Sequence, residues 1–472
     1  MDYSEEFFGN DNDYFLDDNE IKEKIENCKK AIADGQIYSF METIEEVIQI
    51  CVESGYVSDG LYLVNALLEV TPYNAELWQL KGIFLNDSFE FEEAYRCFNT
   101  SLSLNPNDVE TLINKSHAED NLDLDDDAIS TLEKAISIDP SNEEAYFNLA
   151  VLFERAEQFP KAIELLTAAA NIDKEYSEVF YELGYCYESI EDYNKSLAAY
   201  DRYLEIEPYS ATGWYNRGII LIKLQNFNSA INSFELAIAI KDEFSSAHFN
   251  KGIAQANTGK LKDALSSFRR AAEIDKYDEA IFFNIGQIYE ELEDIPNALK
   301  NYSMAIKLND EYCDAYLSRG FCYDSVGKFQ LALKDFNKVI SLAKDSAEAW
   351  YAKADLEYSL GQLNESIASY KRALEIEPNN YDVWSKLAET YLELGNWLEG
   401  MEAFNHCIEL NPADAASYYG KAKVNFILSR TQEAIDCLKH AFSLDPTIKT
   451  EFAREYPEIK SSKLFKKLLE EN

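Results

Sequence analysis

Residues 211–244, ATGWYNRGIILIKLQNFNSAINSFELAIAIKDEF, hold one copy of a pattern that returns every 34 residues along this chain. The pattern runs from Met41 to Ile448 without insertion or deletion, in twelve blocks that begin at Met41, Ala75, Val109, Glu143, Ser177, Ala211, Ser245, Glu279, Cys313, Ala347, Tyr381 and Ala415. Repetition at this length is the signature of a solenoid of stacked helix pairs. It overrides the expectation of several globular domains that a chain of 472 residues would otherwise raise.

Two positions of the block are small and a third is large. Position 20 carries nothing larger than serine: Gly60, Ala94, Ala128, Ala162, Ser196, Ala230, Ala264, Ala298, Ala332, Ser366, Gly400 and Ala434. Position 8 is also small from the second block onward: Gly82, Ser116, Ala150, Gly184, Gly218, Gly252, Gly286, Gly320, Ala354, Ala388 and Ala422. Position 24 is large and apolar or aromatic: Val64, Phe98, Leu132, Leu166, Tyr200, Phe234, Phe268, Tyr302, Phe336, Tyr370, Phe404 and Leu438.

Helical geometry turns these columns into a packing prediction. Positions 4, 8 and 11 share one face of a first helix, and positions 20, 24 and 27 share one face of a second. We therefore expect antiparallel helix pairs in which the small positions receive bulky side chains of the neighbouring helix.

Proline and glycine fall where such helix pairs must turn. Seven of the ten prolines occupy position 32, where a missing N–H ends the second helix: Pro72, Pro106, Pro140, Pro208, Pro378, Pro412 and Pro446. Pro160 and Pro296 share position 18, the expected first turn of the second helix, where proline is tolerated. Position 15, between the helices, predicts glycine caps at Gly55, Gly259, Gly327, Gly361 and Gly395.

With these columns aligned, the pattern resembles the tetratricopeptide repeat. The family's spacing is met by Trp214, Gly218, Leu221, Ala230, Phe234 and Ala237, while Arg217 stands where the family has leucine. Blocks headed by Trp78, Trp350 and Trp384 match comparably. The resemblance covers residues 41–448. It implies an all-α, right-handed superhelical solenoid of antiparallel helix pairs (a TPR array) that holds other polypeptides on its concave face.

The segments outside the repeats divide the rest of the chain. Residues 1–19 form an acidic, aromatic-containing tail, which is either a solubilising tail or a linear motif for a partner. Because a solenoid exposes an apolar face at each end, we expect capping helices at residues 20–40 and 449–472. The second of these alternates apolar and basic residues and is interpreted as a cap rather than a membrane-surface helix.

The charge of the chain excludes several classes of partner. Lys+Arg 43 against Asp+Glu 86 gives a formal net charge of −43, which disfavours nucleic acid and anionic membranes. No apolar stretch approaches the ~20 residues of a membrane span, and residues 1–20 lack the positive start of a signal peptide. The eight cysteines contain no C-x-x-C pair. We therefore expect a cytoplasmic protein with reduced, structural thiols.

Each candidate catalytic or metal-binding motif in the sequence has a structural explanation that fits it better. Asp123, Asp125 and Asp127 have the spacing of a calcium loop, but the glycine and the bidentate glutamate of such a loop are missing, so helix capping is expected. Cys437, His440 and His406 suggest a metal site, yet position 26 is otherwise a basic, solvated column. No nucleophile–base set or phosphate-binding loop is present. We predict no enzyme, no cofactor and no metal site.

Binding is expected on the first helices, where the resemblance places ligand contacts at positions 2, 5, 6, 9, 12 and 13. Position 5 carries an aromatic ladder of Phe147, Tyr181, Tyr215, Phe249, Phe283 and Tyr351. Position 6 carries amides that could hydrogen-bond a ligand backbone: Asn114, Asn148, Asn216, Asn250 and Asn284. Both columns are also ordinary for the fold itself. Acidic residues at positions 12 and 13 favour a basic or neutral protein or peptide over an acidic one.

Two functions follow from this sequence. The first is a non-enzymatic scaffold or adaptor that binds protein or peptide partners along its concave face. The alternative is a regulatory or assembly subunit that associates with itself through its repeats into a homo-oligomer. Light scattering separates the two, since a concentration-independent monomer gives no support to self-assembly.

Overall fold

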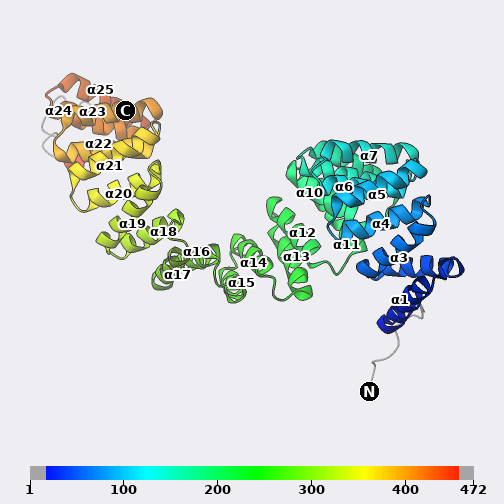
Figure 1. The fold of residues 1–472 in the computed structure, drawn as a ribbon. Coiled ribbons are helices and arrows are strands. Elements are labelled where there is room, and N and C mark those ends of the chain that lie inside the picture. The colour runs from blue at the N-terminus through cyan, green and yellow to red at the C-terminus, as the bar shows by residue number, and fades with distance from the viewer. Residues whose placement is uncertain (1–16, 457–472) are drawn as a thin grey trace, which may run out of the picture. The chain divides into compact units, whose positions relative to one another are not determined.

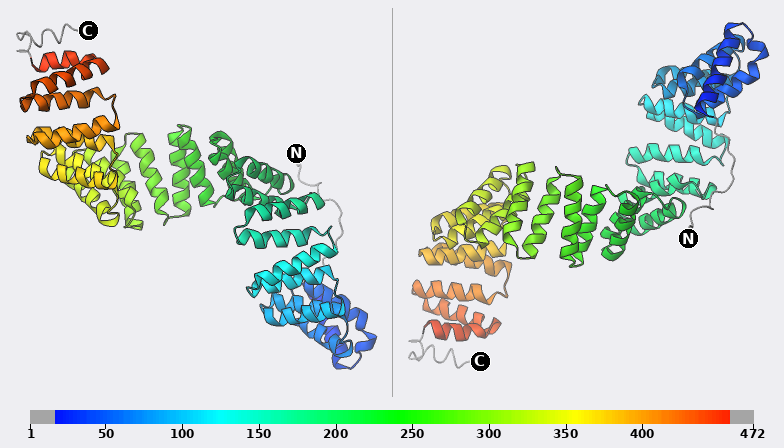
Figure 2. Two further views of the ribbon diagram at one scale, coloured as in Figure 1. Left: turned by 90° about the horizontal axis from the view of Figure 1, so that it is seen from above. Right: turned by 90° about the horizontal axis from the view of Figure 1, so that it is seen from below.

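The computed structural model describes residues 17–456, in which every regular element is a helix. The predicted all-α solenoid is confirmed. The helices form two compact units that divide between Ile240 and Lys241. Each unit contains six of the 34-residue repeats, and in each the helix pairs lie side by side in chain order (Figures 1 and 2).

The first unit holds helices α1 to α13 and one short 3-10 helix, η1. Their bounds are α1 Asp18–Ala33, η1 Ile37–Ser39, α2 Met41–Glu53, α3 Val57–Val70, α4 Ala75–Asp87, α5 Phe91–Leu104, α6 Val109–Asn121, α7 Asp125–Ile138, α8 Glu143–Arg155, α9 Phe159–Ile172, α10 Ser177–Ser189, α11 Tyr193–Ile206, α12 Ala211–Lys223 and α13 Phe227–Ile240.

The second unit holds helices α14 to α26. Their bounds are α14 Ser245–Asn257, α15 Leu261–Ile274, α16 Glu279–Glu291, α17 Ile295–Leu308, α18 Cys313–Ser325, α19 Phe329–Leu342, α20 Ala347–Ser359, α21 Leu363–Ile376, α22 Tyr381–Leu394, α23 Trp397–Leu410, α24 Ala415–Ile427, α25 Thr431–Leu444 and α26 Thr447–Glu455. In both units the even-numbered helices from α2 to α24 are the first helices of the repeats.

The two helices of a pair touch through the small and large columns, as predicted. A Cβ atom added to Gly218 would lie 2.5 Å from the Phe234 ring of the same repeat. Further pairs of position-8 glycine and position-24 ring make the same close approach: Gly184 with Tyr200, Gly252 with Phe268, Gly286 with Tyr302, and Gly320 with Phe336. Glycine at these positions lets the ring approach the first helix closely.

Every turn between the two helices of a repeat has one left-handed residue, at position 15. The five glycines predicted as caps have φ between 72° and 83°. The other seven repeats place a larger residue in the same conformation: Phe89, Asp123, Glu157, Glu191, Gln225, Glu293 and Ser429. The turn geometry is thus set by the packing of the pair and not by glycine. The two prolines expected in the first turn of second helices lie there, at the starts of α9 and α17.

Helices at both ends cover the outermost repeats. In α1, Ile21, Ile25 and Cys28 are buried against the first repeat. In α26, Phe452 is buried and its ring packs near those of Tyr419 and Phe442 of the last repeat. The acidic tail proposed for residues 1–19 lies outside the described residues up to position 16. The segment expected to cap the far end lies outside them from position 457 onward.

Candidate functional site

The surface formed by positions 2, 5, 6, 9, 12 and 13 is called the first-helix face. In the first unit its ladder consists of Phe147, Tyr181 and Tyr215, on α8, α10 and α12. All three are half-buried. Tyr181 and Tyr215 pack on the position-24 rings of their own repeats, with ring centroids 5.8 Å apart for Tyr181 and Tyr200 and 5.9 Å apart for Tyr215 and Phe234.

The ladder of the second unit is built in the same way from Phe249, Phe283 and Tyr351. Their centroids lie 5.5, 5.7 and 6.0 Å from those of the position-24 rings beneath them. The predicted ladder rings are therefore partly core residues, and they form a floor for the face. The sequence left this double role open, because aromatic residues at position 5 are also ordinary for the fold itself.

Two ladder rings are covered further by a tyrosine from the loop at the end of their own repeat. Phe147 lies 5.2 Å from Tyr176, and Phe283 lies 5.1 Å from Tyr312, between ring centroids. Both tyrosines occupy position 34, where other repeats have a capping side chain such as Asn142. In these two repeats the residue at position 34 packs on a ring and its side chain does not cap the next helix.

The predicted asparagine column makes bonds within the repeats. Asn216 Nδ2 donates to the Tyr181 hydroxyl at 3.0 Å and so links successive repeats of the first unit. Asn250 and Asn284 donate to carbonyl oxygens one turn earlier in their own helices. Asn148 Nδ2 is buried without a hydrogen-bond partner, and Asn114 is half-buried. The amides of Asn216, Asn250 and Asn284 are thus engaged in bonds within the array.

The most exposed ring of this face in the first unit belongs to a residue that the sequence did not single out. Tyr185, at position 9 of α10, is 44% exposed. Val151 and Ile219 hold the same position on α8 and α12, and both are half-buried. Together with the ladder they form an apolar strip, here defined as Phe147, Val151, Tyr181, Tyr185, Tyr215 and Ile219. The run of apolar residues at position 9 in three successive repeats was the signal that could have found it.

Carboxylates border this strip and are partly withdrawn from water. Burial raises the pKa of Glu182 to about 7, and the neighbouring Glu154 carboxylate adds to the effect. Burial also raises the pKa of Glu154, whose Oε2 accepts a hydrogen bond from the Cys186 thiol at 3.6 Å. Burial raises the pKa of Glu188 as well. An acidic edge of this kind favours a cation or a proton over an anion.

The second unit carries a pocket of about 710 Å³ on its first-helix face, between α22, α24 and α26. Among the described residues that line it, five are acidic: Glu389, Glu393, Asp414, Asp445 and Glu451. Lys423 is the one base of that lining, and its Nζ lies 2.9 Å from Glu455 Oε2. The sequence did not predict this pocket, because one of its walls is α26, and the packing of α26 beside α24 is a tertiary contact that the repeat pattern does not specify.

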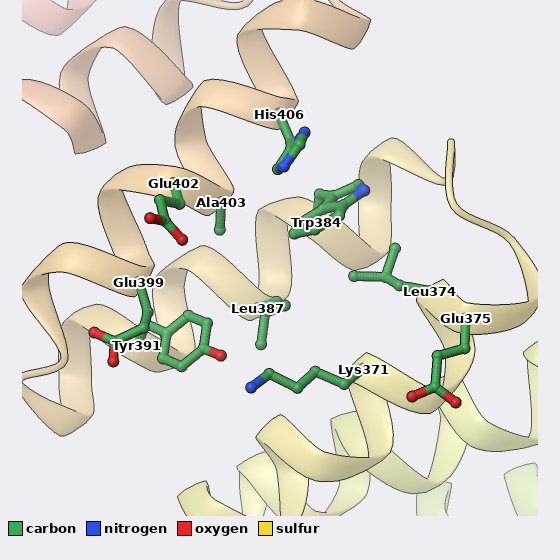
Figure 3. A pocket seen from close by; sticks show the side chains of 10 residues that line it. All are labelled: Lys371, Leu374, Glu375, Trp384, Leu387, Tyr391, Glu399, Glu402, Ala403 and His406. Atoms are coloured by element: carbon green, nitrogen blue, oxygen red, sulfur yellow. The ribbon is translucent and has the colours of Figure 1, made fainter.

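A second cavity, of about 410 Å³, lies on the opposite side, between α21 and α23 over α22 (Figure 3). The His406 ring stacks on Trp384 at 4.3 Å between centroids. A cavity of about 400 Å³ occupies the same block positions between α15 and α17, over α16. A hollow that recurs at the same columns is a product of the repeat geometry, so it does not mark a site.

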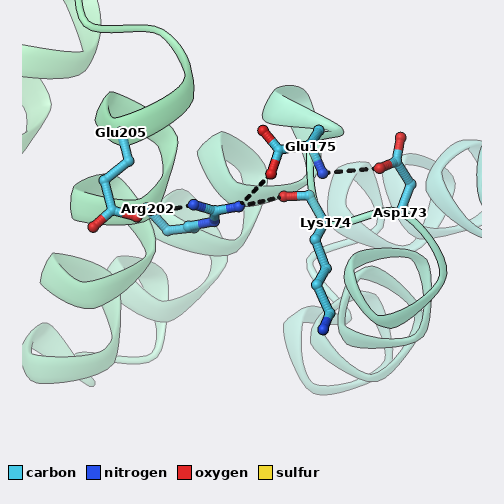
Figure 4. A network of polar contacts seen from close by, with 5 residues as sticks. All are labelled: Asp173, Lys174, Glu175, Arg202 and Glu205. Carbon is cyan, nitrogen blue, oxygen red and sulfur yellow. Dashed lines mark hydrogen bonds and ion pairs between the residues drawn. The ribbon is translucent and has the colours of Figure 1, made fainter.

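Position 26, the basic column that includes His406 and His440, ties repeats together. Arg202 donates to the Lys174 carbonyl and to the Glu175 carboxylate of the preceding loop, both at 2.8 Å (Figure 4). Its other end bonds Glu205 at 2.9 Å.

Asp125 and Asp127, from the calcium-like spacing, lie in the first turn of α7. Within residues 17–456, no group of three His, Cys, Asp or Glu side chains is placed to hold a metal ion.

The fold and this face define an all-α helical-repeat protein with an extended face on its first helices. A family model described as TPR repeat matches residues 354–395, and models described as Tetratricopeptide repeat match residues 126–183 and 215–279. A further tetratricopeptide repeat model matches residues 109–142, 177–210, 314–346, 381–414 and 415–448. Four of these five segments begin and end with the blocks read from the sequence. The chain belongs to the tetratricopeptide repeat family.

Solved structures of repeat proteins are similar to parts of the chain. YrrB, titled a TPR protein with an unusual peptide-binding site, is 25% identical, with a TM-score of 0.36 over 39% of this chain and 95% of its own. A structure of MamA is 25% identical, with a TM-score of 0.33 over 35% of this chain and 96% of its own. MamA from Desulfovibrio magneticus RS-1 is 19% identical, with a TM-score of 0.35 over 36% and 96%. A search of curated protein sequences gave no match.

Tetratricopeptide repeats bind proteins or peptides, so the chain has the architecture of a protein-interaction scaffold. Among the described helices, none combines the length and the apolar character that crossing a bilayer requires.

Proposed function

We propose that the chain is a non-enzymatic adaptor whose first unit binds a basic or neutral protein segment along the apolar strip of its first-helix face. The observation that carries this proposal is Tyr185, which is 44% exposed on a face where burial has partly desolvated the carboxylates of Glu154 and Glu188. An exposed aromatic ring supplies apolar contact area, and the carboxylates select for positive charge at its edge.

The binding mechanism is equilibrium association with a preformed surface. The ladder rings are already packed on their own repeats, so little side-chain ordering is required when a ligand arrives. Successive repeats present similar contacts, so that many weak interactions add along an extended or helical segment. The second unit has a corresponding ladder of Phe249, Phe283 and Tyr351. These rings and the amides of Asn250 and Asn284 remain part of the proposal.

A random peptide display library tests this proposal, because it offers the chain basic, neutral and acidic segments side by side. Peptides enriched on the full chain are expected to combine apolar residues with more Lys and Arg than Asp and Glu. The Tyr185→Ala substitution should lower the affinity of the chain for the enriched peptides by about tenfold, which is the scale of losing a central aromatic contact. A higher salt concentration should lower the affinity further, because the carboxylates at the edge of the strip are partly exposed and are screened by salt.

A matched control is available within the same unit. Leu236, on the second helix α13, is also 44% exposed, so Leu236→Ala removes a comparable apolar surface outside the first-helix face. Equal losses in the Tyr185 and Leu236 variants would show that the strip is not the binding surface. Enrichment of acidic peptides would contradict the charge preference.

A further inference from the structure

A second exposed aromatic ring lies in the second unit at the place that Tyr185 has in the first. Phe321 occupies position 9 of α18, four repeats after Tyr185, and it is 40% exposed. Each ring rests against another: Tyr185 lies 6.2 Å from Phe159, and Phe321 lies 5.4 Å from Phe336, between centroids. Among the twelve repeats, position 9 carries an aromatic ring of this kind at these two places only. The repeat geometry therefore does not require an aromatic residue there.

The surroundings of the two rings recur with them. In the repeat before each ring, a phenylalanine at position 5 packs on a tyrosine at position 34. The centroids lie 5.2 Å apart for Phe147 and Tyr176 and 5.1 Å apart for Phe283 and Tyr312. The only prolines at position 18 of any repeat also belong to these two repeats, at the starts of α9 and α17. The chain thus contains the same two-repeat module twice, at residues 143–210 in the first unit and 279–346 in the second.

A buried thiol follows each exposed ring and bonds a carboxylate of the preceding repeat. Cys186 and Cys322 are the only cysteines at position 10 of any repeat, and both are buried. The Cys186 thiol donates to Glu154 at 3.6 Å, and the Cys322 thiol is hydrogen-bonded to Glu290. Glu154 and Glu290 share position 12. Each thiol therefore fixes a carboxylate near the exposed ring that precedes it.

A second carboxylate lies on the helix of each exposed ring. Position 12 is Glu188 on α10 and Asp324 on α18, and burial raises the pKa of both carboxyl groups. Arg319 of α18 does not neutralise this edge, because its Nε is paired with Asp335 at 2.8 Å. Both modules therefore combine an exposed ring with partly desolvated acids, which favour positive charge.

The second module differs from the first at several positions. The second strip is here defined as the residues of the second unit at the positions of the apolar strip: Phe283, Gln287, Leu317, Phe321, Tyr351 and Asp355. Its two polar members make it less apolar than the strip of the first unit. Ser318 stands at the position of Glu182, but Asp355 adds a carboxylate that acts on Asp324. We therefore expect the same class of ligand, bound more weakly.

We propose that the second strip is a second binding site, so that one chain holds two basic or neutral protein segments, one in each unit. This inference rests on the proposed function, because it assumes that the apolar strip of the first unit binds such a segment. Charge complementarity selects the occupant, since the acids beside each ring favour Lys or Arg next to an apolar contact. The chain is then a bivalent adaptor that joins two copies of its partner.

Titration calorimetry of the full chain counts the sites. The probe is a synthetic copy of the most enriched peptide from the display selection. We expect two peptides per native chain, the second bound more weakly than the first. Phe321→Ala should lower the affinity of the weaker site about tenfold and leave the stronger site unchanged, and Tyr185→Ala should do the reverse.

Two further variants serve as controls. Phe321→Tyr should keep the second site, because the first unit has tyrosine at the same position. Leu331→Ala removes a side chain that is 43% exposed on the second helix α19, and it should leave both sites unchanged. Circular dichroism of each variant verifies that the helices are retained.

The outcomes separate this inference from the proposed function. One peptide per chain, weakened by Tyr185→Ala and not by Phe321→Ala, would overturn the second site and leave the proposed function intact. Binding that responds to neither substitution would overturn both. Two peptides per chain with equal losses in the Phe321→Ala and Leu331→Ala variants would show that the second site lies elsewhere than on the second strip.

Discussion

Position 15 shows how a single backbone angle is imposed on different residues. All twelve repeats place this residue in the left-handed region, and only five of them use glycine. A residue with a Cβ atom pays about 1–2 kcal/mol for this conformation. Seven turns of the described chain therefore hold strain that the packing of the helix pair offsets.

Relieving one of these turns should stabilise the first unit. Gln225 has φ 57°, so Gln225→Gly removes the Cβ clash at the end of α12. The greater flexibility of glycine in the unfolded chain cancels part of the gain, and we expect a net stabilisation of about 0.5 kcal/mol. Urea unfolding followed by circular dichroism measures it. Gln225→Ala is the control, and it should give no gain, since alanine keeps the Cβ atom.

The carboxylates beside the strip give the first unit a predictable dependence on pH. Burial raises the pKa of Glu182 from 4.5 to about 7, so between these values the folded state holds more protons than the unfolded state. The stability that this group contributes is complete below pH 4.5 and is lost as the pH rises through about 7. The raised pKa of Glu154 acts in the same direction.

The variant Glu182→Asn should remove most of this pH dependence. Asparagine is the residue that neighbouring repeats carry at this position, as in Asn148 and Asn216. At pH 7.5 we expect the variant to be more stable than the native chain by on the order of 1 kcal/mol, with allowance for solvent screening. At pH 5 the difference should shrink. Denaturant melts at the two pH values measure both, and a native chain that is equally stable at both would contradict the assignment.

At the scale of the helix pair, stability depends on one ring entering one glycine position. The pairs of glycine and ring quoted above occur in both units, with added Cβ atoms 2.5 to 2.7 Å from the rings. Neighbouring side chains of a close-packed core cannot yield enough to accept even a methyl group there without a cost.

A double-mutant cycle at Gly218 and Phe234 tests this contact. Gly218→Ala alone should destabilise the chain by about 1–3 kcal/mol, because the methyl group overlaps the ring. In the Phe234→Leu background the same change should cost less, since the shorter side chain leaves room. The coupling energy from thermal or urea unfolding of the four proteins is the measurement. Additive costs would show that the methyl group and the ring do not meet.

At the scale of the whole molecule, the chain is a row of repeats whose contacts are local. In each unit a helix packs on its pair partner and on the adjacent repeat. The free energy of unfolding of such an array is close to a sum of terms for single repeats and for contacts between neighbouring repeats. A destabilising substitution at one end should therefore affect only the repeats nearest to it.

Phe452 of α26 provides a test of this locality. It is 1% exposed, and Phe452→Ala should destabilise the last repeat by about 3–5 kcal/mol through the cavity that it leaves. Amide hydrogen exchange should accelerate in α24 and α25 and stay unchanged in the first unit. Thr450→Ala, an exposed change on the same helix, is the control. Faster exchange throughout the chain would contradict nearest-neighbour coupling.

The sequence by itself determined the helix pairs, their register, the turns and the family. These properties depend on short-range spacing, because residues three or four positions apart share a helix face whatever lies beyond it. Only the tertiary structure decided which of the repeated aromatic residues are covered. Phe147 is packed under Tyr176 of the following loop, whereas Tyr185 remains exposed. The acidic pocket likewise required α26 to pack beside α24, since the exposure of a side chain depends on contacts between residues that no local pattern specifies.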